Sequence, residues 1–463
     1  MSRLSLVALA LLLAAGCAVG PQYQRPMVSV PDAYRGLATE EMARAAPESL
    51  GDQEWTEIFQ DETLQELLRN ALRQNFDVQI AAARILQAEA RVGITRSDEF
   101  PTLDAGAQFS SQRTAESRFS TFSISEGGLD LTAAWEPDFW KKFRSATEAA
   151  RSNLLASQWA RQAVITTLVS EVAGAYFQLR ELDLELDVSK RTLASRQDSL
   201  QLIRLLADRG LSSLLDVRQA EQLVFTAAQA IPDLERRIEQ QENLLSILLG
   251  NVPASVDRGG ELTEQLVAPE VPAGLPSSLL ERRPDIRQAE QQLIALNAQI
   301  GAVKAAVFPQ INLTANGGFQ TSSLTSLFSG PAGMWSFVGA LTQPIFSKGK
   351  LRAGVRLAEA QQQEAVLVYQ QTVQQAFREV SDALVAYRKN QEFRRQQELL
   401  TQSAQDAARL SDIRYRGGVT NYLEVLTNET NHFAAERGLA QAQLNERLAL
   451  VQLYKALGGG WQQ

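Results

Sequence analysis

Four short segments of the chain alternate between apolar and polar residues. In each segment the apolar side chains fall on one face and the polar side chains on the other, as in a β-strand. Each segment runs for about ten residues, the length that a tilted strand needs to cross the hydrocarbon core of a membrane. The first pair lies within residues 102–136 and the second pair within residues 310–343.

Four strands of this kind are too few to close a barrel. An open sheet edge in lipid would leave backbone N–H and C=O groups without partners, at a cost of several kcal/mol each. Because small closed barrels need about eight strands, the pattern predicts that several copies of the chain combine. Two copies would enclose a lumen filled by side chains, so a conducting pore favours three or more copies.

Two much longer stretches have the pattern of helices. Residues 139–206 contain no proline and a single glycine, Gly174, and apolar residues recur there at intervals of three, four and seven. Residues 350–414 repeat this pattern. Such a pattern predicts coiled-coil helices, and at about 1.5 Å per residue each would extend for roughly 100 Å. Helices of this length must pack along other helices.

Each predicted long helix ends at a glycine, Gly210 or Gly418, and the chain then returns. The apolar pattern resumes over residues 214–249 and 422–457. Glycine suits the end of a helix, and Ser212 or Thr420 is expected to cap the helix that follows. Pro232 should kink the first return helix, because proline removes one hydrogen bond of the helix ladder.

The two halves of the chain repeat one another. Phe100-Pro101 recurs as Phe308-Pro309, and Gly210 recurs as Gly418, in both cases 208 positions later (308 − 100 and 418 − 210). A spacing held constant over both halves predicts duplication of a whole structural unit.

The first residues are typical of a secretory signal. One positive charge at Arg3 precedes an apolar run, and the sole cysteine, Cys17, follows it directly. The small residues before Cys17 resemble a bacterial lipobox, so residues 1–16 are expected to be removed and Cys17 to be acylated. Ala18 at the second mature position favours sorting to the outer membrane. The alternative is an ordinary signal peptide followed by an incidental cysteine.

Charge and side-chain chemistry exclude several classes of function. The net charge of −8 argues against a nucleic-acid partner, which would need clustered cations. The sole histidine, His432, lies in a helical pattern without evident partners, and no metal-ligand cluster or phosphate loop is recognisable. The sequence therefore predicts a protein that is not an enzyme and holds no cofactor beyond the covalent lipid on Cys17.

Two motifs make the chain resemble a known family. One is Cys17–Pro26, with the sequence CAVGPQYQRP, and the other is Arg283–Glu290, with the sequence RPDIRQAE. Taken alone, Arg283-Pro284-Asp285 is explained by the start of a helix, with an acid near the positive end of the helix dipole. Together with the repeated Phe-Pro and the two glycine breaks, the motifs make essentially the whole mature chain similar to the TolC-type outer-membrane efflux proteins, in their NodT-like lipoprotein branch.

The resemblance implies a mainly helical protein with a membrane β-barrel portion. Three chains would form a twelve-stranded outer-membrane barrel, continuous with a twelve-helix periplasmic α-barrel and surrounded by a mixed equatorial belt. The assembly would be a passive duct for small molecules in a Gram-negative outer membrane. It would receive its cargo from a periplasmic adaptor protein and an inner-membrane efflux pump.

The resemblance also divides the chain into parts. In chain order these are a lipoprotein signal peptide (1–16), an N-terminal linker and equatorial segment (17–62), repeat 1 (63–250), an equatorial linker (251–276), repeat 2 (277–458) and a C-terminal tail (459–463).

Two functional regions are implied near the glycine breaks. The tips expected to contact the adaptor are Gly210, Leu211, Ser212, Gly418, Val419 and Thr420. The residues expected to form a periplasmic gate are Tyr415, Asp216, Leu423 and Glu424. Three Glu424 side chains around one axis would repel each other and favour cations. The alternatives are that the tips are only helix turns and that Glu424 lies on a solvated helix face. Thr427 and Thr430 depart from the family, whose members carry an acid and an arginine there.

A second function class stays open from the sequence. The alternating segments could be soluble hairpins of a lipid-anchored, helical periplasmic scaffold that has no channel. A scaffold would leave the membrane once its acyl anchor was removed, whereas a barrel would stay embedded.

Overall fold

The computed structural model describes residues 19–35, 49–117, 120–260, 274–322, 327–328 and 330–461. The predicted signal peptide and Cys17 lie outside the described residues, as do residues 261–273 of the predicted equatorial linker. The chain forms two compact units, one from residues 1–27, 84–158 and 288–370 and the other from residues 28–83, 159–287 and 371–463. Within the described residues, none of the helices combines the length and the apolar character that crossing a membrane requires.

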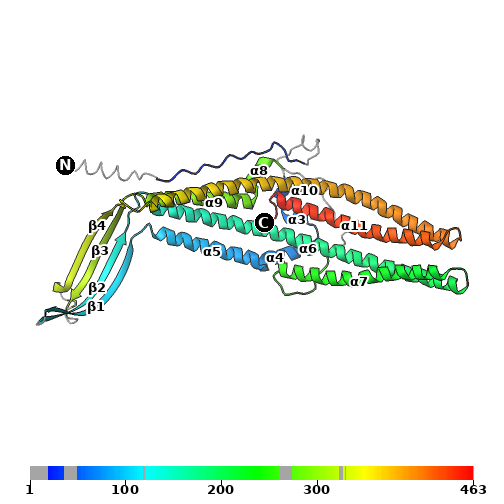
Figure 1. The fold of residues 1–463 in the computed structure, drawn as a ribbon, viewed down its shortest axis with the longest axis horizontal. Coiled ribbons are helices and arrows are strands. Elements are labelled where there is room, and N and C mark those ends of the chain that lie inside the picture. The colour runs from blue at the N-terminus through cyan, green and yellow to red at the C-terminus, as the bar shows by residue number, and fades with distance from the viewer. Residues whose placement is uncertain are drawn as a thin grey trace. The chain divides into compact units, whose positions relative to one another are not determined.

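The first unit contains one antiparallel sheet of the four predicted strands (Figure 1). The strands lie in the order β1 (Thr102–Ser117), β2 (Ser120–Trp135), β3 (Gln310–Thr321) and β4 (Gly333–Thr342). The edges of the sheet are therefore β1 and β4. Large apolar side chains on the sheet are exposed, including those of Leu103, Phe109, Trp335, Phe337 and Leu341.

The connection between the first two strands is shorter than the sequence pattern indicated. Residues 110–126 lie between the two alternating segments and are rich in serine and threonine, a composition typical of a loop. Instead the β1–β2 ladder continues to the pair Ala115↔Thr121, and Ser117 faces Ser120 after one irregularity. Backbone pairing does not depend on apolar side chains, so polar residues extend this hairpin beyond the alternating segments.

The helices of the first unit differ in burial between the two repeats. They are α9 (Pro284–Ala305) from residue 288, α5 (Phe76–Ser97) from residue 84, and the sheet-proximal parts of α6 (Lys142–Asp208) and α10 (Lys350–Arg416). The N-terminal arm lies on α9, where Arg25 Nε is 2.9 Å from Glu290 Oε1 and the Asn297 amide donates to the Pro21 carbonyl at 3.0 Å. No residue of α5 from Arg84 onward is buried, although all of this helix is described.

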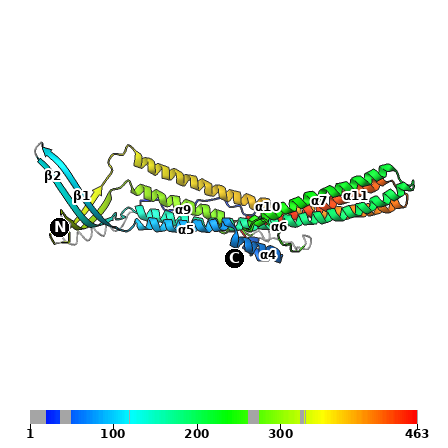
Figure 2. The same ribbon diagram turned by 90° about the horizontal axis from the view of Figure 1, so that it is seen from below.

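The second unit holds the rest of the helices. They are η1 (Leu50–Asp52), α3 (Trp55–Ile58), α4 (Glu62–Gln74), α7 (Leu214–Leu248), α8 (Pro276–Arg282) and α11 (Tyr422–Ala456), with the remaining parts of α5, α6, α9 and α10. The two hairpins α6–α7 and α10–α11 lie side by side (Figure 2), and their ends share one apolar cluster. Helix α7 runs through Pro232 without interruption.

The repeat is visible in how the return helices end. Gly250 ends α7 with a φ of +80°, and Gly458 ends α11 with a φ of +83°, a backbone conformation that glycine adopts without a Cβ penalty. The last carbonyls are bonded at equivalent positions: the Asn75 amide donates to the Leu248 carbonyl at 2.9 Å, and Arg283 Nη1 donates to the Ala456 carbonyl at 3.0 Å. Both donors and both acceptors are 208 residues apart (283 − 75 and 456 − 248).

Candidate functional site: two helix tips and their supports

The first tip is a Schellman turn at the end of α6. The Gly210 amide donates to the Ala207 carbonyl at 2.9 Å and the Leu211 amide to the Leu206 carbonyl at 2.8 Å. Gly210 has a φ of +72°, which most residues with a Cβ avoid. The turn leaves Leu211 74% exposed.

The second tip repeats this geometry at the end of α10. The Gly418 amide donates to the Tyr415 carbonyl at 2.9 Å and the Val419 amide to the Arg414 carbonyl at 3.0 Å. Gly418 has a φ of +70°, and Val419 is 71% exposed. Turn geometry alone does not require an apolar side chain at either exposed position.

The residues that cap the return helices lie one position later than predicted. Ser213, not Ser212, caps α7, and Asn421, not Thr420, caps α11. The hydroxyls of Ser212 and Thr420 instead donate to the carboxylates of Asp216 and Glu424. The Schellman turn uses one more residue than the sequence pattern indicated, which shifts each cap by one position.

Asp216 completes a capping box with Ser213. The Ser213 amide donates to Asp216 Oδ2 at 2.9 Å, and the Asp216 amide donates to the Ser213 hydroxyl at 3.1 Å. Partial burial disfavours ionisation of Asp216, but the hydrogen bonds from Ser213 and Ser212 outweigh it and lower the pKa of this carboxyl. The carboxylate thus stabilises the first turn of α7.

The predicted gate residues lie close together but are not all joined. Tyr415 packs edge-on against Tyr422, with ring centroids 5.3 Å apart, beside the apolar cluster that both hairpins share. Within the described residues, no hydrogen bond joins Tyr415 to Asp216 in one chain. Glu424 forms an ion pair with Arg414, in which Oε1 lies 3.1 Å from Nε. Arg414 was not singled out in the sequence, because no pattern pairs positions on the two sides of a turn. Leu423 is exposed.

Arg283 of the RPD motif has a structural role. Its guanidinium is buried and donates to Asp285 Oδ2 at 2.6 Å, to Glu379 Oε2 at 2.7 Å and to the Ala456 carbonyl. The motif therefore joins α9, α10 and the end of α11, in agreement with the structural interpretation.

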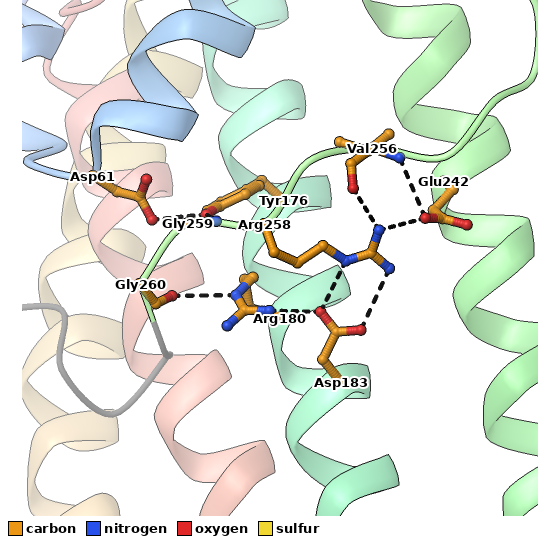
Figure 3. Close-up of polar contacts among 9 residues, drawn as sticks. All are labelled: Asp61, Tyr176, Arg180, Asp183, Glu242, Val256, Arg258, Gly259 and Gly260. Atoms are coloured by element: carbon orange, nitrogen blue, oxygen red, sulfur yellow. Dashed lines mark hydrogen bonds and ion pairs between the residues drawn. The ribbon is translucent and has the colours of Figure 1, made fainter.

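A second arginine organises the segment that follows α7 (Figure 3). Arg258 forms an ion pair with Asp183 of α6, at 3.2 Å from Nε, and another with Glu242 of α7. Next to it the Gly259 amide donates to the Tyr176 hydroxyl at 3.0 Å, which in turn donates to Asp61 Oδ2 at 2.7 Å. These contacts join residues 256–260 to α6 and α7 and, through Tyr176, to Asp61 at the N-cap of α4.

The Arg258 network was missed in the sequence. Its members come from four separate stretches, so no local spacing indicates it. The only signal is an arginine beside two glycines in a loop, which is not specific.

The sole histidine, His432, lies on α11. His432 Nε2 lies 3.9 Å from Glu436 Oε2, one turn away on α11. The described residues contain no group of three or more His, Cys, Asp or Glu side chains that could hold a metal ion.

Comparison with known proteins now places the chain. The model of a family described as "Outer membrane efflux protein" matches residues 67–251 and 275–459. The chain belongs to this family. The two matched segments begin 208 residues apart (275 − 67) and end 208 residues apart (459 − 251), so the family unit is the repeat found in the sequence. The expected resemblance and the outer-membrane location are confirmed.

Relatives match over almost their whole length. The chain is 37% identical to the probable efflux pump outer membrane protein TtgC of Pseudomonas putida, over 99% of this chain and 96% of that protein. It is 33% identical to the cation efflux system protein CusC of Escherichia coli K12, over 98% of each.

Solved structures agree with this assignment. A crystal structure of CusC matches with a TM-score of 0.88 and 31% identity, covering 96% of this chain and 100% of that one. The open state of the Neisseria gonorrhoeae MtrE outer membrane channel matches with a TM-score of 0.87 and 31% identity, covering 96% of this chain and 99% of that one. The protein is therefore an outer-membrane component of efflux.

Proposed function

We propose that this chain forms the passive outer-membrane duct of a tripartite efflux system, with a periplasmic adaptor and an inner-membrane pump as partners. The family membership supports the role, and the exposed, matched tips support a docking partner. Relatives are named for efflux of toluene and of cations, so one duct fold serves unlike cargoes. Cargo selectivity is therefore assigned to the pump, and no catalytic step to the duct.

The duct is a homotrimer with a twelve-stranded barrel. The observation that carries this proposal is the sheet of four strands with free edges at β1 and β4 and exposed apolar side chains. In lipid such edges are tolerated only when another chain pairs with them. Three copies supply about twelve strands, enough for an open lumen.

The duplication supports a specific way of joining the copies. Within one chain, repeat 1 contacts repeat 2 through β2 and β3, where Thr132 pairs with Asn316. A ring needs the same contact from repeat 2 to repeat 1 of the next copy. Moving each residue by 208 positions turns this pair into Ala340 (132 + 208) opposite Gln108 of the neighbouring copy (316 − 208).

The helices support the same arrangement. In α9 a Cβ at Gly301 would lie 2.9 Å from the Ser145 hydroxyl of α6, whereas a Cβ at the equivalent Gly93 of α5 meets nothing within 4 Å. Ala302 of α9 is buried, but its equivalent, Ile94, is 56% exposed. Within one chain α6 packs against α9. We assign the equivalent helix, α10 of the neighbouring copy, to this open face of α5.

Cysteine pairs test the barrel and its register. Ala340→Cys with Gln108→Cys should cross-link chains into a covalent ladder, because opposed Cα atoms in a sheet lie at about 4.5–5.5 Å, within disulfide range. Ala340→Cys with Gly106→Cys is the matched control, since its two positions are diagonal neighbours, roughly 7–8 Å apart. Efficient cross-linking of the control alone would refute the register, and a folded monomer in detergent would refute the barrel.

A lipid on Cys17 is part of the proposal and separates it from the scaffold alternative. Cys17→Ser removes the acylation site. A barrel stays in the outer-membrane fraction after alkaline washing, whereas release of the variant protein would favour the anchored scaffold.

The six tip residues are assigned to adaptor contact. Val419→Asp places a charge on the exposed apolar position without touching the Schellman hydrogen bonds. Capture of the adaptor should fail while the trimer persists, and Asp406→Asn, an exposed change on α10, is the control. Loss of the trimer in Val419→Asp would contradict a role confined to the tip.

Tyr415, Asp216, Leu423 and Glu424 are assigned to the gate. Tyr415→Phe combined with Asp216→Ala is expected to raise conductance in planar bilayers, because it removes the hydroxyl and the carboxylate that the proposed gate would join between neighbouring copies. Ser213→Ala is the control, since it weakens the same cap but keeps the carboxylate. Equal conductance of the double variant and the parent protein would count against the gate.

A further inference from the structure

Helix α6 carries two buried glutamates one turn apart, at positions that the proposed function does not use. Glu181 is 1% exposed and Glu185 is 5% exposed. Both lie in the second unit, where α6 packs against α7 and α11. Burying a carboxylate is costly unless a positive charge or a hydrogen-bond donor compensates it.

Glu185 is compensated from two other helices. Arg237 Nη1 of α7 lies 3.6 Å from its Oε2, and Arg437 Nε of α11 lies 3.3 Å from its Oε1. The first contact closes the hairpin to which α6 belongs. The second joins this hairpin to the other one, so Glu185 is a link between the two hairpins.

Glu181 has no such compensation. No arginine or lysine of the described residues lies within ion-pair distance of it, and its Oε1 atom is buried without a hydrogen-bond partner in the described part of the chain. Glu185 lies four residues further along α6, the spacing at which side chains of one helix are neighbours, and it is buried as well. Two carboxyl groups can bond to each other only if one of them carries a proton.

We propose that Glu181 and Glu185 hold one proton between them and that this proton keeps Glu185 available as the link between the α6–α7 and α10–α11 hairpins. In the protonated pair Glu181 donates to Glu185, which stays charged and binds both arginines. When the proton leaves to solvent, two buried negative charges lie one turn apart and must share Arg237 and Arg437. The link between hairpins then weakens.

The repeat argues that the pair is not a general part of the helical hairpin. The positions 208 residues later (181 + 208 and 185 + 208) hold Lys389 and Phe393. Among the described residues, Lys389 forms one ion pair, with Glu392 three residues along α10. The Glu181–Glu185 pair therefore occurs in repeat 1 and has no counterpart at the equivalent positions of repeat 2.

The direction of the pH response follows from the environment of Glu181. The groups that act on it are Glu185 on its own helix, Arg237 from α7 and Arg437 from α11. Burial, followed by repulsion from Glu185, raises the pKa of Glu181 to about 7. Since this acid has a raised pKa in the closed bundle, its stabilising effect is full below the ordinary pKa of glutamate, near 4.5, and is lost as the pH rises towards 7.

Infrared difference spectroscopy of the detergent-solubilised full-length protein detects the proton directly. The parent protein should show the C=O stretch of a protonated, buried carboxyl that disappears as the pH is raised through about 7. Glu181→Gln should abolish this titrating band, and Glu392→Gln, on the equivalent face of repeat 2, should not. A band that persists in Glu181→Gln, or no band titrating near neutral pH in the parent, would overturn the proposal.

Hydrogen exchange separates a proton-dependent link from a merely structural glutamate. Glutamine mimics the protonated acid, so amides of α6 and α11 near the pair should be better protected in Glu181→Gln than in the parent at about pH 8. The ratio of protection between the two proteins should grow by more than about ten-fold from pH 5 to pH 8, because each pKa unit corresponds to a ten-fold change. Equal protection at both pH values would show that the proton has no effect on the link.

Discussion

At the scale of single residues, the two halves solve one problem with different chemistry. The last carbonyl of a return helix needs a donor. Asn75 provides it from a neutral amide, whereas Arg283 provides it from a buried guanidinium that also binds Asp285 and Glu379. Arg283 therefore joins more groups than Asn75 does, and its removal would leave two carboxylates and a carbonyl without their donor.

Removing these donors should therefore have unequal effects. Arg283→Met should lower the free energy of unfolding of the helical region by about 2–3 kcal/mol, because charged groups lose their partner, and Asn75→Ala by about 1 kcal/mol. Chemical denaturation followed by circular dichroism measures both. A larger loss in Asn75→Ala would contradict the assigned role of the RPD motif.

Asp216 gives a pH-dependent prediction at the same scale. Its pKa is lowered in the folded protein, so its contribution is present above the ordinary pKa of 3.8 and is lost as the pH falls through the native value. Asp216→Ala should loosen the first turn of α7 by about 1 kcal/mol at neutral pH. Hydrogen exchange of that turn should differ between variant and parent at pH 7 and converge in strong acid; a constant difference at all pH values would refute the role of the charge.

At the scale of elements, the tips show which features a sequence can predict. Alternation identified the strands and the glycine breaks identified the turns, since both depend on local periodicity and backbone freedom. The prediction that Ser212 caps α7 was wrong, because the geometry of the turn decides which side chain reaches the free amides at the start of the helix. The Arg258 network could not be predicted, because its partners meet only in the folded chain.

The positive φ angles of the tip glycines allow a matched test of backbone freedom. Gly418→Ala should destabilise the end of α10 by about 1 kcal/mol, because φ is positive there while the Cβ itself meets no atom within 4 Å. Gly354→Ala, in the interior of the same helix, should be neutral or stabilising by up to about 1 kcal/mol. Local hydrogen exchange on α10 measures both, and equal effects would mean that backbone strain is not the reason for glycine at the tip.

At the scale of the whole molecule, the open face of α5 predicts how copies meet. Gly93→Trp should leave the single chain folded, because no atom of the described residues lies within 4 Å of a Cβ at Gly93. It should block α10 of the neighbouring copy and prevent the proposed trimer. Gly301→Trp should instead disrupt the chain itself, because α6 lies against that position. Light scattering with circular dichroism distinguishes the outcomes, and intact trimers of Gly93→Trp would rule out this packing.

The constant offset between the halves has a consequence for the history of the protein. A polypeptide of half this length could in principle build the same ring from six identical pieces, each meeting its neighbours in one way. Once two such pieces are joined in one gene, their sequences need no longer be identical. One half now has a buried carboxyl pair and the other a buried arginine. In the proposed trimer, a part found in one half only would occur three times around the axis, whereas a part common to both halves would occur six times.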